Sequence, residues 1–165
     1  MGKLFDVALE WLNEEEWSFT EHKSEDGQNA WIKAGYVAEN AKFDIVFDAY
    51  EDIQQFFVYI YFTVSVPEAK RLAVAELLTR LNWGMRIGNF ELDMEDGHIR
   101  CKAFADVEGS ALVPTMITNM LSPVLSSSDK NFPRIMQLCY SDKTVSQVLE
   151  LDDKPAELKE VKTLQ

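Results

Sequence analysis

Three consecutive runs of the chain, 30–37, 42–50 and 55–64, alternate apolar side chains with others in the manner of adjacent β-strands. Short turns at Glu39-Asn40 and at 51–54 would join these runs into antiparallel pairs. The apolar residues then face one another across both pairs: Tyr36 with Phe43, Ala34 with Ile45, Ile32 with Phe47, Phe43 with Phe62, Ile45 with Ile60, and Phe47 with Val58. A slip of one residue would turn every one of these side chains to the other face. The agreement therefore predicts a three-strand antiparallel meander with one buried face.

The second face of this meander is also rich in aromatic and apolar side chains. In the same registers it carries Trp31, Val46, Phe57, Tyr59 and Tyr61. A sheet face that is open to water is expected to be polar. Either the chain's own helices cover these residues, or the residues form a surface for a partner or for a second copy of the chain. We take the five as candidate partner-binding or dimer residues.

Further helices and strands are predicted before and after the meander. In chain order they are a helix over 4–12, a helix from Pro67 to near Gly84, a two-strand hairpin at Asp96-Gly97, and a long helix over 112–139. Pro123 lies inside the long helix, which we expect to be kinked or broken. The order helix, three strands, helix, two strands, helix predicts an antiparallel α+β fold. We expect a single domain over 1–151 and a charged, flexible tail over 152–165.

The hairpin has a specific predicted register. A two-residue type I′ turn at Asp96-Gly97 places Leu92 opposite Cys101 on the apolar side. On the other side it places acidic residues opposite basic ones, namely Asp93 opposite Arg100 and Glu91 opposite Lys102.

The segment from Leu81 to Leu92 reads LNWGMRIGNFEL, and it is followed by Asp96-Gly97 and a strand beginning His98-Ile99-Arg100. This combination resembles the central signature of the YbjN family, whose members are named bacterial sensory transduction regulators. Phe132-Pro133 also resembles that family's pattern, and the order of elements is similar to that of the class I type III secretion chaperone fold. The resemblance implies a non-enzymatic, dimeric α+β module, related in shape to chaperones that hold a partner polypeptide in extended form.

The chain is strongly acidic. Its 165 residues include 28 Asp and Glu against 16 Lys and Arg, a net charge of −12. Phosphate backbones and anionic lipids bind through Lys and Arg, so we expect neither a nucleic-acid partner nor a membrane partner. Cys101 and Cys139 lie far apart within apolar patterns, and no export signal is visible. We expect a bacterial cytoplasmic protein with two buried, reduced thiols, with a Cys101–Cys139 disulfide as the alternative.

The residues that carry catalysis or metal binding do not form a recognisable pattern. His22 and His98 lie at or beside predicted turns and have no oriented partner in the sequence. Asp44 and Asp48 share one face of a strand but lie about 13 Å apart, too far to hold one ion. The segment 93–97 departs from a calcium loop because its Gly is displaced by one position. We expect a protein that is not an enzyme and has no metal or cofactor.

Two functions remain open from the sequence. The first is a chaperone-like or regulatory adaptor, a homodimer that binds an unidentified protein partner through apolar sheet or helix surface. The second is a small-molecule sensor whose ligand lies between the sheet and the long helix, near the adaptable side chains of Met116 and Met120. Both methionines are also ordinary core residues at helical spacing. A hydrolase ranks third.

Overall fold

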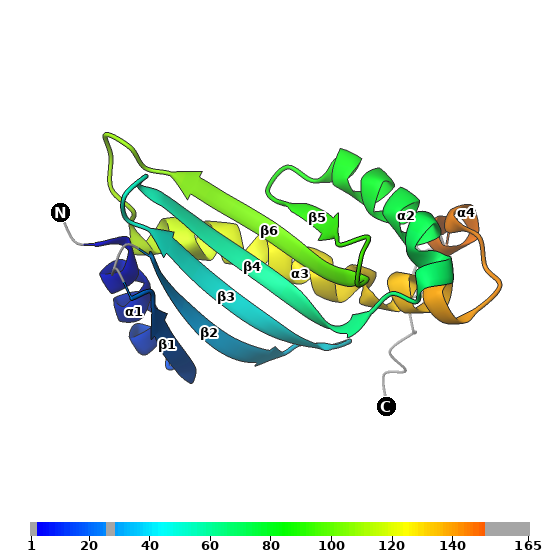
Figure 1. Cartoon of the computed structure of the whole chain (residues 1–165), viewed down its shortest axis with the longest axis horizontal. Helices are drawn as coiled ribbons and strands as arrows, with labels where there is room; N and C mark the ends of the chain where they lie inside the picture. The colour runs from blue at the N-terminus through cyan, green and yellow to red at the C-terminus, as the bar shows by residue number, and fades with distance from the viewer. Residues whose placement is uncertain (1–2, 26–28, 151–165) are drawn as a thin grey trace, which may run out of the picture.

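The computed structural model describes residues 3–25 and 29–150, and one antiparallel sheet forms its centre (Figure 1). The strand order is β1-β2-β3-β4-β6-β5. The strands are β1 (Phe19–Lys23), β2 (Asn29–Val37), β3 (Lys42–Tyr50), β4 (Gln55–Ser65), β5 (Asn89–Leu92) and β6 (His98–Asp106). The helices are α1 (Leu4–Glu14), the 3₁₀ turn η1 (Glu68–Lys70), α2 (Arg71–Gly84), α3 (Pro114–Tyr140) and α4 (Val145–Leu149). The predicted α+β class is confirmed.

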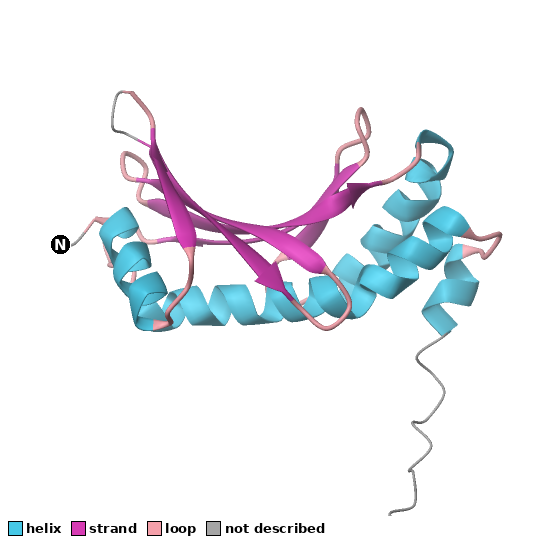
Figure 2. Ribbon diagram, turned by 90° about the horizontal axis from the view of Figure 1, so that it is seen from below, coloured by secondary structure: helices cyan, strands magenta, loops and turns pink. Residues whose placement is uncertain are grey.

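The helices lie under the convex face of the sheet and beyond its β5 edge (Figures 1 and 2). In Figure 2, α3 runs beneath the sheet, α1 lies under the end that carries β1, and α2 and α4 pack at the opposite end of α3. Aromatic side chains fill the space between these layers: Trp11 of α1 lies 5.8 Å from Phe47, and Phe132 of α3 lies 6.0 Å from Phe62. The opposite, concave face of the sheet carries no helix from the described residues. This arrangement leaves the second face of the meander uncovered by the helices.

The meander has the predicted registers. β2 pairs with β3 through Ile32 and Phe47, and β3 pairs with β4 through Phe47 and Val58. One strand was not predicted. β1 adds to the outer edge of β2, so four successive strands follow one another in this half of the sheet.

The predicted hairpin register was wrong by two residues. Leu92 lies opposite Ile99 instead of Cys101, and four residues, 94–97, form the loop. The loop is closed by the backbone N–H of Gly97, which donates to the Asp93 carbonyl at 2.9 Å. Gly97 has φ +81°, and a Cβ there would lie 2.3 Å from the Val66 carbonyl oxygen. A register shift of two leaves each side chain on the same face, so the predicted sorting of apolar and charged residues is unchanged.

The long helix is continuous. α3 runs for 27 residues with Pro123 and Pro133 inside it, so a break into two halves was wrong. Ser128, fully buried, satisfies its hydroxyl by donating to the Val124 carbonyl at 2.7 Å. The helix predicted from Pro67 begins instead with η1, after which α2 ends at Gly84 as predicted.

Two expectations concern the chain as a whole. Within the described residues, none of the helices has the length and apolar character needed to cross a bilayer. The predicted tail over 152–165 lies outside the described residues.

Candidate functional site

The five candidate residues lie together on the concave face of the sheet. Trp31 comes from β2, Val46 from β3, and Phe57, Tyr59 and Tyr61 from β4. Each alternates with a buried neighbour that points toward the helices, such as Phe47 beside Val46. We call this concave side the open face; it comprises the side chains of Trp31, Lys33, Asp44, Val46, Asp48, Tyr50, Phe57, Tyr59, Tyr61, Glu91, His98, Arg100, Lys102, Phe104 and Asp106, together with His22.

The rings of the open face contact one another across the strands. Phe57 stacks on Tyr59 of the same strand at 5.7 Å and on Phe104 of β6 at 5.4 Å. Tyr50 meets the edge of Phe57 at 5.6 Å. Trp31 is 36% exposed and Phe104 is 56% exposed. Half-exposed rings in mutual contact form a rigid surface that loses little side-chain entropy on binding.

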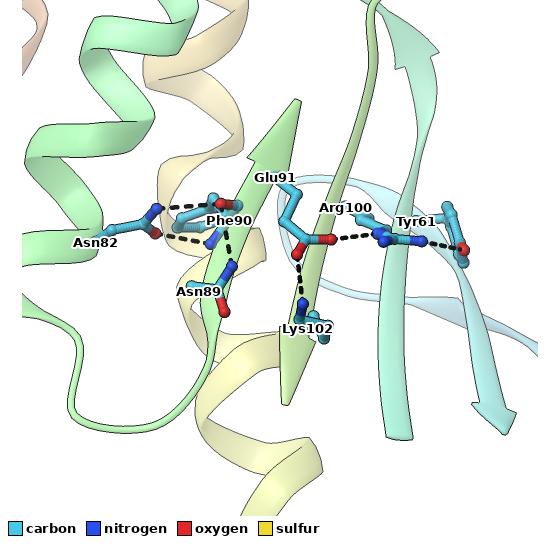
Figure 3. Close-up of polar contacts among 7 residues, drawn as sticks. All are labelled: Tyr61, Asn82, Asn89, Phe90, Glu91, Arg100 and Lys102. Atoms are coloured by element: carbon cyan, nitrogen blue, oxygen red, sulfur yellow. Dashed lines mark hydrogen bonds and ion pairs between the residues drawn. The ribbon is translucent and has the colours of Figure 1, made fainter. Parts of the chain in front are cut away.

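Arg100 of β6 contacts two of the tyrosine rings of this surface. The Arg100 guanidinium lies 4.6 Å from the ring centre of Tyr59. It also donates to the Tyr61 hydroxyl at 3.1 Å, as Figure 3 shows. Its Nε and the Lys102 ammonium both contact the Glu91 carboxylate. Burial raises the pKa of Tyr59 to about 12, and the nearby Arg100 charge offsets only part of this effect. The phenol of Tyr59 is therefore neutral at physiological pH.

The open face has two hollows in the part that includes Tyr61. One hollow of about 560 Å³ lies between Tyr61, Glu91 and Arg100. A second, of about 640 Å³, lies between Trp31, Asp48 and Tyr61. Tyr61 and His98 line both, so the two hollows are adjacent, and we call the pair the groove. Each volume is within the range of ligand sites in proteins.

The carboxylates and histidines of this face show no catalytic arrangement. His22 stacks on Trp31 at 5.4 Å, and His98 contacts its neighbour Asp96 at 2.8 Å. Burial raises the pKa of Asp48, an effect that a hydrogen bond from Tyr50 reduces. No group of three or more His, Cys, Asp or Glu that could hold a metal ion occurs in the part of the chain that the structure describes.

The two cysteines are free and buried, as predicted. Burial raises the pKa of the Cys101 thiol to about 12 and also raises that of Cys139. Both side chains are therefore protonated thiols at neutral pH, which are poor nucleophiles.

The candidate ligand position between sheet and long helix is occupied by the core. Met120 is buried there, and Met116 packs against the same cluster. Sequence reasoning missed three parts of the open face: His22, because its strand was not predicted, and Arg100 and Phe104, because the pairing of β6 with β4 was not considered. The alternation of β6, with Cys101 and Ala103 buried, was the signal that could have found the last two.

Comparison with known proteins gives one family and one fold. The model of the YbjN family, described as "Putative bacterial sensory transduction regulator", matches residues 5–136. Among solved structures, the chain is similar to the crystal structure of YbjN from E. coli, described as "a putative transcription regulator". The TM-score is 0.56 at 16% identity, with 76% of this chain and 86% of that chain covered, a likeness that concerns the fold alone. No curated protein matches the chain.

Proposed function

Since this chain belongs to the YbjN family, which is described as one of regulators, we propose that the protein is a regulatory adaptor that holds a segment of another polypeptide on its open face. The observation that carries the proposal is a concave sheet face, lined by contacting rings, with no helix of the described residues over it. Tyr, Trp and Arg are the residues enriched where proteins bind one another, and all three lie on this face.

The groove favours an extended segment as the occupant. Its two hollows lie next to each other, with Tyr61 and His98 in the lining of both. An extended chain places alternate side chains on one side, so successive side chains would enter successive hollows. The similarity in element order to chaperones that hold extended polypeptides supports the same interpretation.

The proposed adaptor is not an enzyme, binds neither nucleic acid nor membrane, and acts in the bacterial cytoplasm. The protein acts without catalysis, which the protonated thiols support. Its net charge of −12 disfavours nucleic acid and anionic membranes as partners. Free, unpaired cysteines support a bacterial cytoplasmic location. We also propose a homodimer, for which the outer side of α2 offers Trp83, 94% exposed.

Affinity capture from native lysate tests the proposal. Wild type is compared with Tyr59→Asp, which puts a charge in the centre of the open face, and with Trp83→Asp, which changes an equally aromatic residue on α2. Circular dichroism confirms that each variant is folded. We expect a partner that wild type and Trp83→Asp retain and Tyr59→Asp loses. Equal retention by all three would remove the open face as the binding surface.

Light scattering of the same proteins tests the dimer. A dimer that persists in Tyr59→Asp and dissociates in Trp83→Asp is the expected result. If Tyr59→Asp alone dissociates, the open face is the interface between two copies instead.

A further inference from the structure

One row of side chains crosses the open face from strand to strand. The register places His22, Trp31, Asp48, Phe57 and Phe104 directly opposite one another on β1, β2, β3, β4 and β6. We call these five residues the aromatic row. His22 stacks on Trp31 and Phe57 stacks on Phe104, so a pair of rings lies on each side of Asp48. A single carboxylate therefore separates two ring stacks in the middle of the sheet.

The Asp48 carboxylate has no basic partner among the described residues. The Lys and Arg side chains of the open face are engaged elsewhere: Lys33 contacts Asp44 at 2.9 Å, and Arg100 and Lys102 both contact Glu91. The neighbouring Tyr50 hydroxyl donates to Asp48, but it brings no positive charge. Asp48 is half-buried, and the hollow of about 640 Å³ opens beside it.

We propose that Asp48 and the rings of the aromatic row form a binding site for one positively charged side chain, lysine or arginine, of the polypeptide held on the open face. The inference rests on the proposed function and specifies the chemistry of the partner. The faces of Trp and Phe rings attract a cation, and the carboxylate between them supplies its counter-charge. The aliphatic stem of a lysine or arginine packs on the same rings.

Charge in the surrounding chain favours the same occupant. Residues 1–65, which include β1 to β4, contain 13 acids and 4 bases, so this half of the molecule is strongly negative. A negative field raises the association rate of a cationic segment and repels an anionic one. The positive charge of the partner would thus be attracted to strands β1 to β4, which carry His22, Trp31, Asp48 and Phe57 of the aromatic row.

Two synthetic peptides test the site on the full chain. Both are extended sequences that alternate valine and threonine; one carries a central lysine, the other a central glutamine. Isothermal titration calorimetry measures each against wild type, Asp48→Asn and Asp106→Asn. Asp106 is the matched control because it lies on the same face, at the end of β6, and contacts Gln55 instead of a ring.

We expect wild type and Asp106→Asn to bind the lysine peptide about three- to thirtyfold more tightly than the glutamine peptide, the range of cation–π contacts. In Asp48→Asn the ratio should fall below the wild-type value, because the counter-charge is lost while the rings remain, and an unchanged ratio would remove Asp48 from the site. Trp31→Ala should lower the ratio, whereas Trp31→Phe should keep most of it.

Other outcomes overturn the inference. Equal binding of the two peptides by wild type removes the cation site; if Tyr59→Asp abolishes that binding, the proposed function stands without it. If neither peptide binds, the cationic side chain of an extended segment is not the occupant of the site. The proposed function is then tested independently by affinity capture with wild type and Tyr59→Asp. Butylammonium that binds wild type as tightly as the lysine peptide identifies a small organic cation as the ligand instead.

Discussion

The side chain of Asn82, in the last turn of α2, should contribute to stability well beyond its size. Its Oδ1 accepts the backbone N–H of Phe90 at 2.7 Å, and its Nδ2 donates to the Phe90 carbonyl at 3.1 Å (Figure 3). Phe90 lies on β5, a four-residue edge strand whose other side pairs with β6. Asn82 therefore makes the two hydrogen bonds that a further strand would otherwise make, and it keeps this edge from pairing with another chain.

Asn82→Ala removes both bonds and leaves two half-buried backbone groups to water. At about 0.5–1.5 kcal/mol for each hydrogen bond, the free energy of unfolding should fall by about 1–3 kcal/mol. For a chain of this size the corresponding drop in Tm is about 2–12 °C. Urea unfolding followed by circular dichroism measures the first quantity, and calorimetry measures the second.

Two further variants distinguish the loss of the two Asn82–Phe90 hydrogen bonds from a general effect of substitution on stability. Asn82→Asp keeps the acceptor but sets a carboxylate oxygen against the Phe90 carbonyl, so it should be at least as harmful as alanine at neutral pH. Asn89→Ala removes one long contact to the same carbonyl, at 3.4 Å, and should cost little. A loss below about 0.5 kcal/mol in Asn82→Ala, or an equal loss in Asn89→Ala, would refute the reasoning.

Three more predictions concern the loop, the ion pairs and the phenol. Gly97→Ala should lower the free energy of unfolding more than Gly109→Ala in urea titrations, because both positions have positive φ but only at Gly97 does a new Cβ meet backbone, 2.3 Å from the Val66 oxygen; equal losses would contradict this. Burial raises the pKa of Glu91, but hydrogen bonds from Lys102 and Arg100 outweigh it and lower the pKa below the ordinary value. The ionised Glu91 therefore stabilises the fold above its unfolded pKa, and the advantage of wild type over Glu91→Gln should shrink as the pH falls below about 4.5, while a pH-independent difference would exclude this linkage. Tyr59→Phe should remove, from an alkaline absorbance titration, the phenol with the pKa near 12. A loss of absorbance change from the lower-pH part of the curve instead would show that Tyr59 ionises with the exposed tyrosines.

The meander was predictable because two independent signals agreed. Alternation placed Ile45 and Phe47 on one face, and short turns placed their partners opposite them. β1 lacked the first signal: it reads FTEHK, and four of its five residues are exposed on an edge strand. Backbone pairing with β2, rather than burial of its own side chains, holds it in the sheet.

The hairpin register was wrong because the deciding contacts come from outside the hairpin. Asp96-Gly97 is a strong local turn signal. However, the Val66 N–H donates to the Gly97 carbonyl at 2.8 Å, and Arg71 of α2 donates to the carbonyls of Met94 and Glu95. These contacts stabilise the longer loop. Apolar alternation could not exclude it, because a shift of two residues leaves both faces unchanged.

The candidate site was predictable in its residues but not in its exposure. Alternation alone placed Trp31, Phe57 and Tyr59 on the second face. Whether helices cover that face depends on how α1 and α3 dock, and both dock on the other side of the sheet. To predict the environment of Asp48, the pairings of β1 with β2 and of β6 with β4 were needed as well, because they place His22 and Phe104 in the same row.

The two buried thiols can be used to measure local opening of the fold, because each becomes reactive only when it is exposed. Cys101 lies in β6, on the side of the sheet that α3 covers, where Ser128 contacts it, while Cys139 lies near the end of α3 beside Lys70. A thiol-reactive reagent modifies each side chain only when its surroundings separate, so the rate of modification measures local opening. Since α2 and α4 pack at that end of α3, Cys139 reports fraying of the helical end, and Cys101 reports loss of the sheet. Mass spectrometry of a single time course would thus rank the stabilities of the two halves without any added label site.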